Sequence, residues 1–197
     1  MDTLESLIKT LARLPGLGPR SARRLALHLL KKKDTLMVPL GEQILNTAEQ
    51  IVTCGTCGNL GLTDPCSICS DPRRDKTQVC IVEDVDDLWA IERTNTYRGV
   101  YHVTGGTLSA LDGIRPEDLR IPQLMERVFD PSAPVTEIIL ALSATVDAQA
   151  TGYYISDQLK DSRVRVTRLA QGIPVGSELD YLDDGTLSLA LQSRQAI

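Results

Sequence analysis

Hydrophobic positions near the start of the chain recur at the spacing of an amphipathic helix. One run follows the i, i+3, i+4, i+7 pattern, and a second run repeats it: Leu4, Leu7, Ile8 and Leu11, then Ala22, Leu25, Ala26 and Leu29. Between them lies "LPGLGPRSA", where Pro15 and Gly16 end the first helix and Pro19 suits the first turn of the second. The pattern predicts two short helices joined by a tight turn.

The pattern changes in the second half of the chain, where apolar runs rich in β-branched residues alternate with helical segments. Strands are expected at 79–83, 100–105, 137–144 and 163–170. The segments between them have helical patterns, and Trp89 falls on the apolar side of its helix with Val85 and Leu88, which predicts a core position. Strands that alternate with helices favour an α/β fold with a mostly parallel sheet flanked by helices.

Composition favours a folded protein with one main core. The chain has 197 residues, of which 42% are hydrophobic and 24% charged, enough for a medium domain with small satellites. The first residues carry charges too often for a signal peptide, and no apolar run approaches the roughly 18 residues needed to span a bilayer. We therefore expect a cytoplasmic protein without a membrane partner.

The charge is unevenly distributed. The net charge is −5, but residues 1–33 carry +6 and the remainder −11. A basic end on an acidic body indicates a polyanion that binds at one place, although a solvated basic surface would give the same pattern.

The predicted turn has the chemistry of a phosphate site. Gly16 and Gly18 leave backbone N–H groups uncovered beside a helix N-terminus, which attracts phosphate oxygens. The cations expected on the second helix are Arg20, Arg23, Arg24 and Lys31. Contacts of this kind carry no base information. "LPGLGPRSARRLALHLL" resembles the helix-hairpin-helix DNA-binding motif; the alternative is a tight turn with a solvated basic face.

Four of the five cysteines form two CxxC pairs, Cys54 with Cys57 and Cys66 with Cys69. Two such pairs can surround one zinc ion with four thiolates, which leaves no open position, so we expect one structural Zn²⁺ per chain. Disulfides are the weaker alternative in a chain without a secretory signal. Cys80 lies in a strand-like run and is expected to be an inert buried thiol.

Two acids follow predicted strands. Glu83 ends the first strand and Asp147 follows the third, so both are expected at the same sheet edge. This resembles the Toprim domain, whose signature is a Glu after the first strand and a D-x-D pair after the third. Gln149 replaces the second acid of that pair. The acidic edge is therefore expected to bind a partner or, weakly, a metal, and Mg²⁺ binding is left open.

Over nearly its whole length the chain resembles the RecR family of bacterial recombination mediators. "IERTNTYRGVYHVTGGTLSALDGIRPEDL", "TVDAQATGYYI" and "GIPVG" are close to the family's pattern. The resemblance implies four parts: a helix-hairpin-helix region (1–52), a four-Cys zinc finger (53–76), a Toprim domain (77–171) and a C-terminal tail for oligomerisation (172–197).

The resemblance also implies a function in recombinational DNA repair. Family members are non-catalytic. They form rings of two to four copies that clamp double-stranded and gapped DNA at the nucleoid. With the partner proteins RecO and RecF they load RecA on single-stranded DNA. Arg20 and Arg24 match the family's DNA-contact positions. Two alternatives remain: a Mg²⁺-dependent Toprim-type nuclease using Glu83 and Asp147, and a zinc-stabilised scaffold that does not touch DNA.

Overall fold

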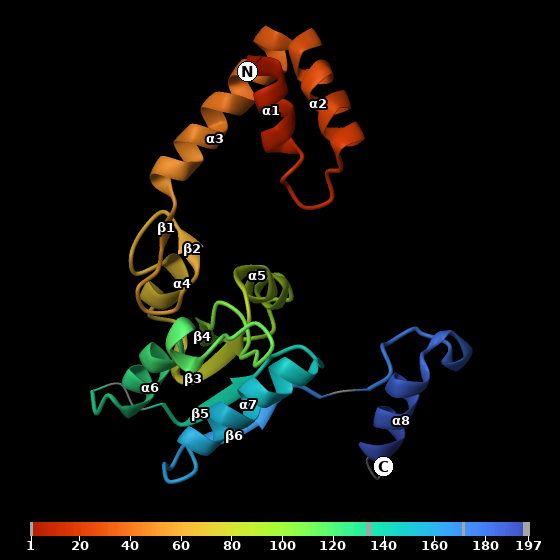
Figure 1. The fold of residues 1–197 in the computed structure, drawn as a ribbon. Helices are drawn as coiled ribbons and strands as arrows, with labels where there is room; N and C mark the ends of the chain where they lie inside the picture. Colours follow the sequence, from red (N-terminus) through yellow and green to blue (C-terminus); the bar gives the residue numbers. More distant parts are fainter. Residues whose placement is uncertain (1, 133–134, 171, 195–197) are drawn as a thin grey trace. The chain divides into compact units, whose positions relative to one another are not determined.

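The computed structural model of the chain describes residues 2–132, 135–170 and 172–194 (Figure 1). The chain divides into two compact units, Met1–Ile51 and Val52–Ile197.

The first unit is helical. Its elements are α1 (Thr3–Leu11), α2 (Pro19–Lys31), a short π-helix η1 (Lys33–Met37) and α3 (Val38–Gln50). The Asp2 side chain caps α1 by accepting the N–H of Leu4 at 3.2 Å. The apolar stripe of α2 is buried at Ala22, Ala26 and Leu29 and packs in the hairpin with α1. The two helices predicted from the periodicity are therefore confirmed.

Helix α3 was not among the predicted elements, and it is exposed along its whole length. It has no buried residue, and its large apolar side chains at Leu40, Ile44 and Leu45 are exposed by 39%, 60% and 65%. Large apolar side chains that stay exposed on a helix indicate that no described part of the same chain covers the apolar face of α3.

The second unit contains a four-stranded sheet in the order β4-β3-β5-β6, in which every pairing is parallel. The strands are β3 (Asp75–Val82), β4 (Gly99–Val103), β5 (Glu137–Leu140) and β6 (Arg165–Arg168). In the central register, Cys80 of β3 lies opposite Tyr101 of β4 and Ile139 of β5. This confirms the α/β prediction, although β5 and β6 are shorter than the apolar runs that predicted them.

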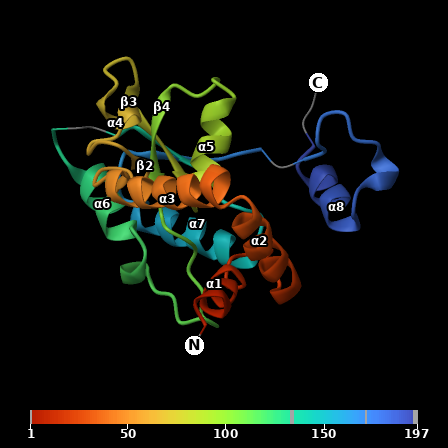
Figure 2. The same cartoon turned by 90° about the horizontal axis from the view of Figure 1, so that it is seen from above.

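Helices cover both faces of this sheet (Figures 1 and 2). They are α5 (Val85–Arg93), α6 (Ile121–Phe129) and α7 (Val146–Gln158). One face packs Val79 and Ile81 against Leu124 of α6 and Ile155 of α7. The other face packs Cys80, Val82, Tyr101 and Val103 with Leu88 of α5. One of the segments with a helical pattern, residues 115–128, is split into a 3-10 turn η2 (Pro116–Asp118) and α6, because Pro122 fits only the first turn of a helix.

The core position predicted for Trp89 is wrong. Its side chain is 53% exposed, while its neighbour Leu88 is fully buried. The indole Nε1–H donates to the Asn59 Oδ1 at 3.1 Å, so the ring lies at the surface with its polar atom bonded to the segment that holds the four clustered cysteines, residues 52–74, called here the cysteine segment. Helical periodicity cannot separate an inward position from one that borders another segment.

The cysteine segment contains a two-residue antiparallel pair, β1 (Val52–Thr53) with β2 (Leu60–Gly61), and one helical turn, α4 (Ser67–Ser70). The described tail contains a 3-10 turn η3 (Leu179–Tyr181) and α8 (Asp184–Gln192). Neither tail element has a buried residue. Among the described residues, no helix combines the length and apolar character that crossing a membrane requires.

Candidate nucleic-acid interface and metal centre

The hairpin turn exposes backbone donors at the start of α2. Gly16 has a φ of +77°, which a residue with a side chain adopts only at a cost. Gly18 is the N-cap of α2 and offers no side chain to its N–H groups, and Pro19 follows at the first helical position. A Cβ on Gly18 would meet nothing within 4 Å, so this helix end is open to an approaching ligand. An uncapped helix N-terminus in the open binds anions.

All four predicted cations of α2 are exposed: Arg20, Arg23, Arg24 and Lys31. In the described part of the chain none of them forms an ion pair with a carboxylate. Arg20, Arg24 and Lys31 lie on the side of the helix opposite the buried stripe of Ala22, Ala26 and Leu29. Arg23 lies on the flank between the two sides. The structure therefore places these cations on the same helix as the open N-terminus.

The four predicted cysteines converge. Their Sγ atoms all lie within 4.8 Å of one another, and Cys57 Sγ is 3.6 Å from Cys66 Sγ. A tetrahedral zinc site with bonds of about 2.3 Å has sulfur–sulfur edges of about 3.8 Å. Cys54, Cys57 and Cys66 are buried and Cys69 is partly exposed. The four sulfurs fit a closed tetrahedral metal site.

Hydrogen bonds and acidities of these thiols fit the same conclusion. The N–H groups of Asn59 and Cys66 donate to the Cys57 and Cys54 sulfurs, each at 3.4 Å. Burial opposes ionisation of Cys54, but its N–H donors outweigh burial and lower its pKa to about 7. The hydrogen bond with Cys69, followed by burial, raises the pKa of Cys57. Crowded thiols of this kind need a cation before all four can ionise.

The fifth cysteine, Cys80, is buried as predicted. Cys80 is buried in β3, away from the four-cysteine cluster, and burial raises the pKa of its thiol to about 12. Cys80 packs with Val82, Tyr101 and Leu88 in the core on one face of the sheet. A protonated thiol is also a poor nucleophile and a poor metal ligand.

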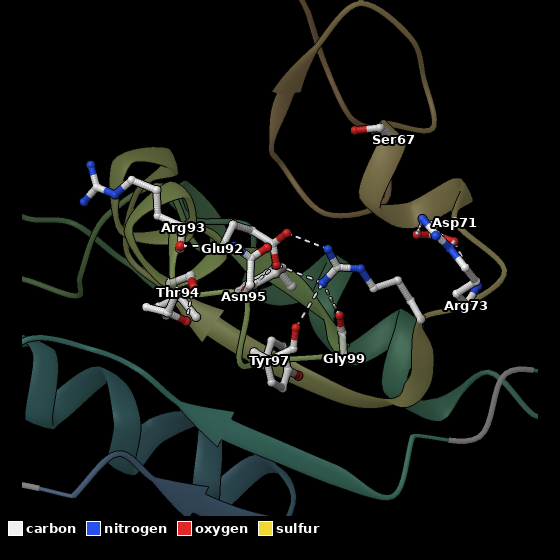
Figure 3. A network of polar contacts seen from close by, with 12 residues as sticks. Ser67, Asp71, Arg73, Glu92, Arg93, Thr94, Asn95, Tyr97 and Gly99 are labelled. Carbon is white, nitrogen blue, oxygen red and sulfur yellow. Dashed lines mark hydrogen bonds and ion pairs between the residues drawn. The ribbon is translucent and has the colours of Figure 1, made fainter.

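Arg74, where the chain leaves the cysteine segment for β3, forms an ion pair with the carboxylate of Glu92 at the end of α5 (Figure 3). The Arg74 Nη1 donates to Glu92 Oε1 at 2.8 Å and to the Gly99 carbonyl at 3.2 Å. The Tyr101 hydroxyl donates to the same Glu92 oxygen at 2.7 Å. This network joins the exit of the cysteine segment to α5 and β4.

Glu83 follows β3 and Asp147 lies in the first turn of α7, after β5, so both are at the carboxyl edge of neighbouring strands as expected. The Glu83 carboxylate accepts the backbone N–H of Ser143 in the β5–α7 loop. The Gln149 side chain donates weakly to the Ala144 carbonyl at 3.5 Å. One carboxylate oxygen of Glu83 is therefore used in a hydrogen bond that connects the end of β3 to the loop after β5.

The remaining acids of this edge begin α5. Asp84 is its N-cap and forms a capping box with Asp87. Burial, together with the charges of Asp86, Glu83 and Asp84, raises the pKa of Asp87. Within residues 2–132, 135–170 and 172–194, the four cysteines are the only group of three or more side chains spaced to hold a metal ion.

Three parts of the chain match known protein families. A family described as "RecR, helix-hairpin-helix" matches residues 4–48, the Toprim domain family matches 77–170, and "RecR, C-terminal" matches 172–195. A recombination protein RecR of Bartonella henselae is 59% identical over 191 residues, which cover 97% of this chain and 94% of that protein.

The chain belongs to the RecR family. Recombination proteins RecR from Rhodopseudomonas palustris strain TIE-1 and Methylobacterium radiotolerans are 58% and 57% identical, and they cover 97% and 98% of this chain and 94% and 95% of those proteins. Membership confirms the family inferred from the motifs and supports a role in recombination and repair. A helix-hairpin-helix domain in this family also suggests DNA binding.

Sequence reasoning missed two residues beside the cysteine cluster, Asn59 and Arg120. Asn59 is buried and receives the Trp89 indole N–H, and the Arg120 guanidinium donates to the Gly55 carbonyl at 2.7 Å. The spacing of the cysteines could have drawn attention to Asn59, which lies two residues after Cys57. No local signal identifies Arg120, which lies 65 residues after its acceptor.

Proposed function

We propose that this RecR-family chain is a non-catalytic DNA-binding mediator that clamps gapped duplex DNA as an oligomer. The observation that carries the proposal is the hairpin, where an uncapped helix N-terminus adjoins four exposed cations that have no carboxylate partner in the described residues. Such a surface neutralises phosphates and releases counterions, so its affinity depends on charge and salt rather than on base sequence.

We further propose that RecO and RecF are its protein partners and that the complex loads RecA on single-stranded DNA. The supporting observation is the acidic edge of the sheet, where Glu83 and Asp84 follow β3, Asp86 lies in the first turn of α5 and Asp147 lies in the first turn of α7. Because the acidic edge belongs to the second unit and the basic hairpin to the first, DNA and a basic protein surface can bind to different parts of the chain. A mediator of this kind acts at the nucleoid in the cytoplasm.

The proposed oligomer is a ring of two to four copies. The exposed apolar side chains of α3 and of the tail, which include Ile44, Leu45, Val175 and Tyr181, support it, because folded monomers rarely expose so many apolar groups. A cavity of about 550 Å³ beside α7 and the edge strand β6 offers a further apolar surface. The proposed boundaries remain 1–52, 53–76, 77–171 and 172–197.

The proposed cofactor is one structural Zn²⁺ held by Cys54, Cys57, Cys66 and Cys69. Zinc would close the cysteine segment, which is too small for a core of its own. We propose no catalytic residue, because the edge offers Gln149 where a second carboxylate would hold Mg²⁺ and because Glu83 already bonds to Ser143.

The test is binding of the full chain to gapped duplex DNA at two salt concentrations, with Mg²⁺ present and the products separated on a denaturing gel. The variant is Arg20→Glu with Arg24→Glu. The control is Arg93→Glu with Arg163→Glu, which makes the same charge change at two exposed arginines outside the hairpin.

We expect the hairpin variant to lose most binding, the control to retain it, and the DNA to remain intact. Equal losses of DNA affinity in both variants would show that binding depends on the overall charge of the chain and not on a site in the hairpin. Unchanged binding in the hairpin variant would favour a scaffold without DNA contact. Cleaved DNA that disappears with Glu83→Ala would establish a nuclease instead.

A further inference from the structure

The first metal-ligand turn, Cys54–Asn59, is held by donors that come from distant parts of the second unit. The N–H of Val103, at the end of β4, donates to the Cys57 carbonyl at 2.7 Å. The Trp89 indole on α5 donates to the Asn59 side chain at 3.1 Å. Half of the cysteine cluster is thus attached to the sheet and to a helix that follows it in the sequence.

Arg120, the N-cap of α6, makes the third attachment and the most extensive one. Its Nη2 donates to the Gly55 carbonyl at 2.7 Å and to the Cys54 carbonyl at 3.5 Å. At the other end of the turn, a Cβ on Gly58 would lie only 3.0 Å from Arg120 Nε. The side chain therefore lies along the turn from Gly58 to Gly55, in space that any side chain at Gly58 would occupy.

The backbone of Arg120 is fixed by β4, which directs the guanidinium at this turn. The Arg120 N–H donates to the Thr104 carbonyl at 2.9 Å, and its carbonyl is 2.7 Å from the Nε2 of the buried His102. The flanking Leu119 and Ile121 are buried. A long side chain that starts from so rigid a backbone loses less conformational freedom when it binds its acceptors.

The positive charge of Arg120 lies beside a site that would be negatively charged with zinc bound. Four thiolates around one divalent cation carry a net charge of about −2, and burial makes that charge costly unless a cation is near. Arg120 Nε is buried without a partner in the described residues. Asp64 adds a negative charge on the other side, since its carboxylate accepts the Gly55 N–H at 2.9 Å. The Gly55 residue is thus held between a carboxylate and a guanidinium.

We propose that Arg120 is a positioning residue for the metal centre. It acts through the Cys54 and Gly55 carbonyls and holds Cys54 and Cys57 at binding distance, while Trp89 on α5 supports the same turn through its hydrogen bond to Asn59. The inference rests on the proposed zinc site. It adds that metal affinity depends on a residue far from the ligands in sequence, as outer-sphere partners do in other metal sites.

The experiment compares full-length wild type, Arg120→Ala, Arg120→Lys and the matched control Arg115→Ala. Arg115 lies on the same loop and is exposed, and its one ion pair within the described part of the chain is with Glu117 at 3.8 Å. Zinc per chain is measured in the purified proteins, and the rate of zinc release to a chromogenic chelator is then followed. We expect Arg120→Ala to release zinc about tenfold to a hundredfold faster, Arg120→Lys to lie between, and Arg115→Ala to match wild type.

Two further readouts separate positioning from packing. The visible spectrum of the Co²⁺-substituted protein reports ligand geometry, and the fluorescence of Trp89, the chain's single tryptophan, reports its contact with the metal-ligand turn. We expect Arg120→Ala to change the Co²⁺ spectrum. A residue that only packs would lower the melting temperature of zinc-loaded and metal-stripped protein equally and leave zinc release unchanged.

Each outcome decides one claim. Wild type that purifies with no zinc, and binds none when it is added, overturns the zinc proposal itself. Wild type with one zinc, together with wild-type release rates in Arg120→Ala, overturns only the positioning role. If Arg120→Ala does not fold, Arg120→Lys takes its place, because it keeps a long cationic side chain but lacks the planar guanidinium that donates to the Gly55 and Cys54 carbonyls. Zinc release at the wild-type rate in Arg120→Lys would then contradict the proposal.

Discussion

Replacing Glu92 with glutamine tests how the cysteine segment is attached to the Toprim domain. The Arg74 and Glu92 side chains are 14% and 23% exposed and form a bidentate pair (Figure 3). Breaking a fully buried pair costs about 3–5 kcal/mol, and an exposed pair contributes less than about 1 kcal/mol. For this mostly buried pair we expect Glu92→Gln to lower the free energy of unfolding by about 2–3 kcal/mol.

The loss follows from the charge that remains. The glutamine amide in this variant would still accept a hydrogen bond, but the Arg74 guanidinium would keep its charge beside the Gly99 carbonyl without a carboxylate. The bond to Arg74 holds the pKa of Glu92 below its ordinary value, so its contribution is complete above that ordinary value and declines only as the pH falls below it. The difference between wild type and variant is therefore expected to be constant between about pH 6 and pH 8.

The assay is urea unfolding followed by Trp89 fluorescence, which reports the second unit, with zinc kept saturating. The neighbouring pair of Arg73 with Asp71 is the control, because Arg73 is 88% exposed and its loss in Arg73→Ala is expected to be unmeasurable (Figure 3). A double-mutant cycle with Arg74→Ala isolates the pair itself. A coupling energy near zero, or equal losses for the Arg73 and Arg74 pairs, would refute the reasoning.

Three other predictions follow from single contacts. Gly99→Ala should cost about 1–3 kcal/mol by urea unfolding, because a Cβ there overlaps the Tyr97 ring; a wild-type midpoint would contradict this. Burial lowers the pKa of His102 to about 4, below its ordinary 6.5, so the unfolded chain binds a proton first and stability falls as the pH drops from about 6.5 to 4, by up to about 3 kcal/mol. His102→Gln should flatten that pH dependence, and an unchanged slope would argue against it. Glu83→Ala should cost about 1 kcal/mol because the Ser143 N–H loses its acceptor, and added Mg²⁺ should raise the melting temperature of neither form; protection of wild type alone would mean that Glu83 binds the metal.

Local patterns predicted the parts of this protein that depend on neighbouring residues. The structure contains four features that local patterns predicted: the helices of the hairpin, the turn at Gly16, the paired cysteines and the alternation of strands with helices. Each of these patterns is set by residues close together in the sequence. The strand order β4-β3-β5-β6 also places Glu83 and Asp147 at one edge, as parallel pairing requires.

Contacts between distant segments could not be predicted in this way. The exposed position of Trp89 depends on Asn59, which precedes it by 30 residues, and the role of Arg120 depends on a carbonyl that precedes it by 65. β5 ends at Leu140 although the apolar run continues, and the Ser143 N–H, three residues later, donates to the Glu83 carboxylate instead of to a neighbouring strand. In each case a tertiary hydrogen bond changed what the local pattern indicated.

The salt dependence of DNA affinity tests the central claim most directly. Fluorescence anisotropy would give the affinity for gapped duplex DNA over a range of salt concentrations, for wild type and for Arg20→Glu with Arg24→Glu. Each lost phosphate contact reduces the slope of log affinity against log salt by about one, so a fall of about two per bound hairpin is predicted, with weaker binding at every salt concentration. An unchanged slope and affinity would show that the hairpin does not contact DNA.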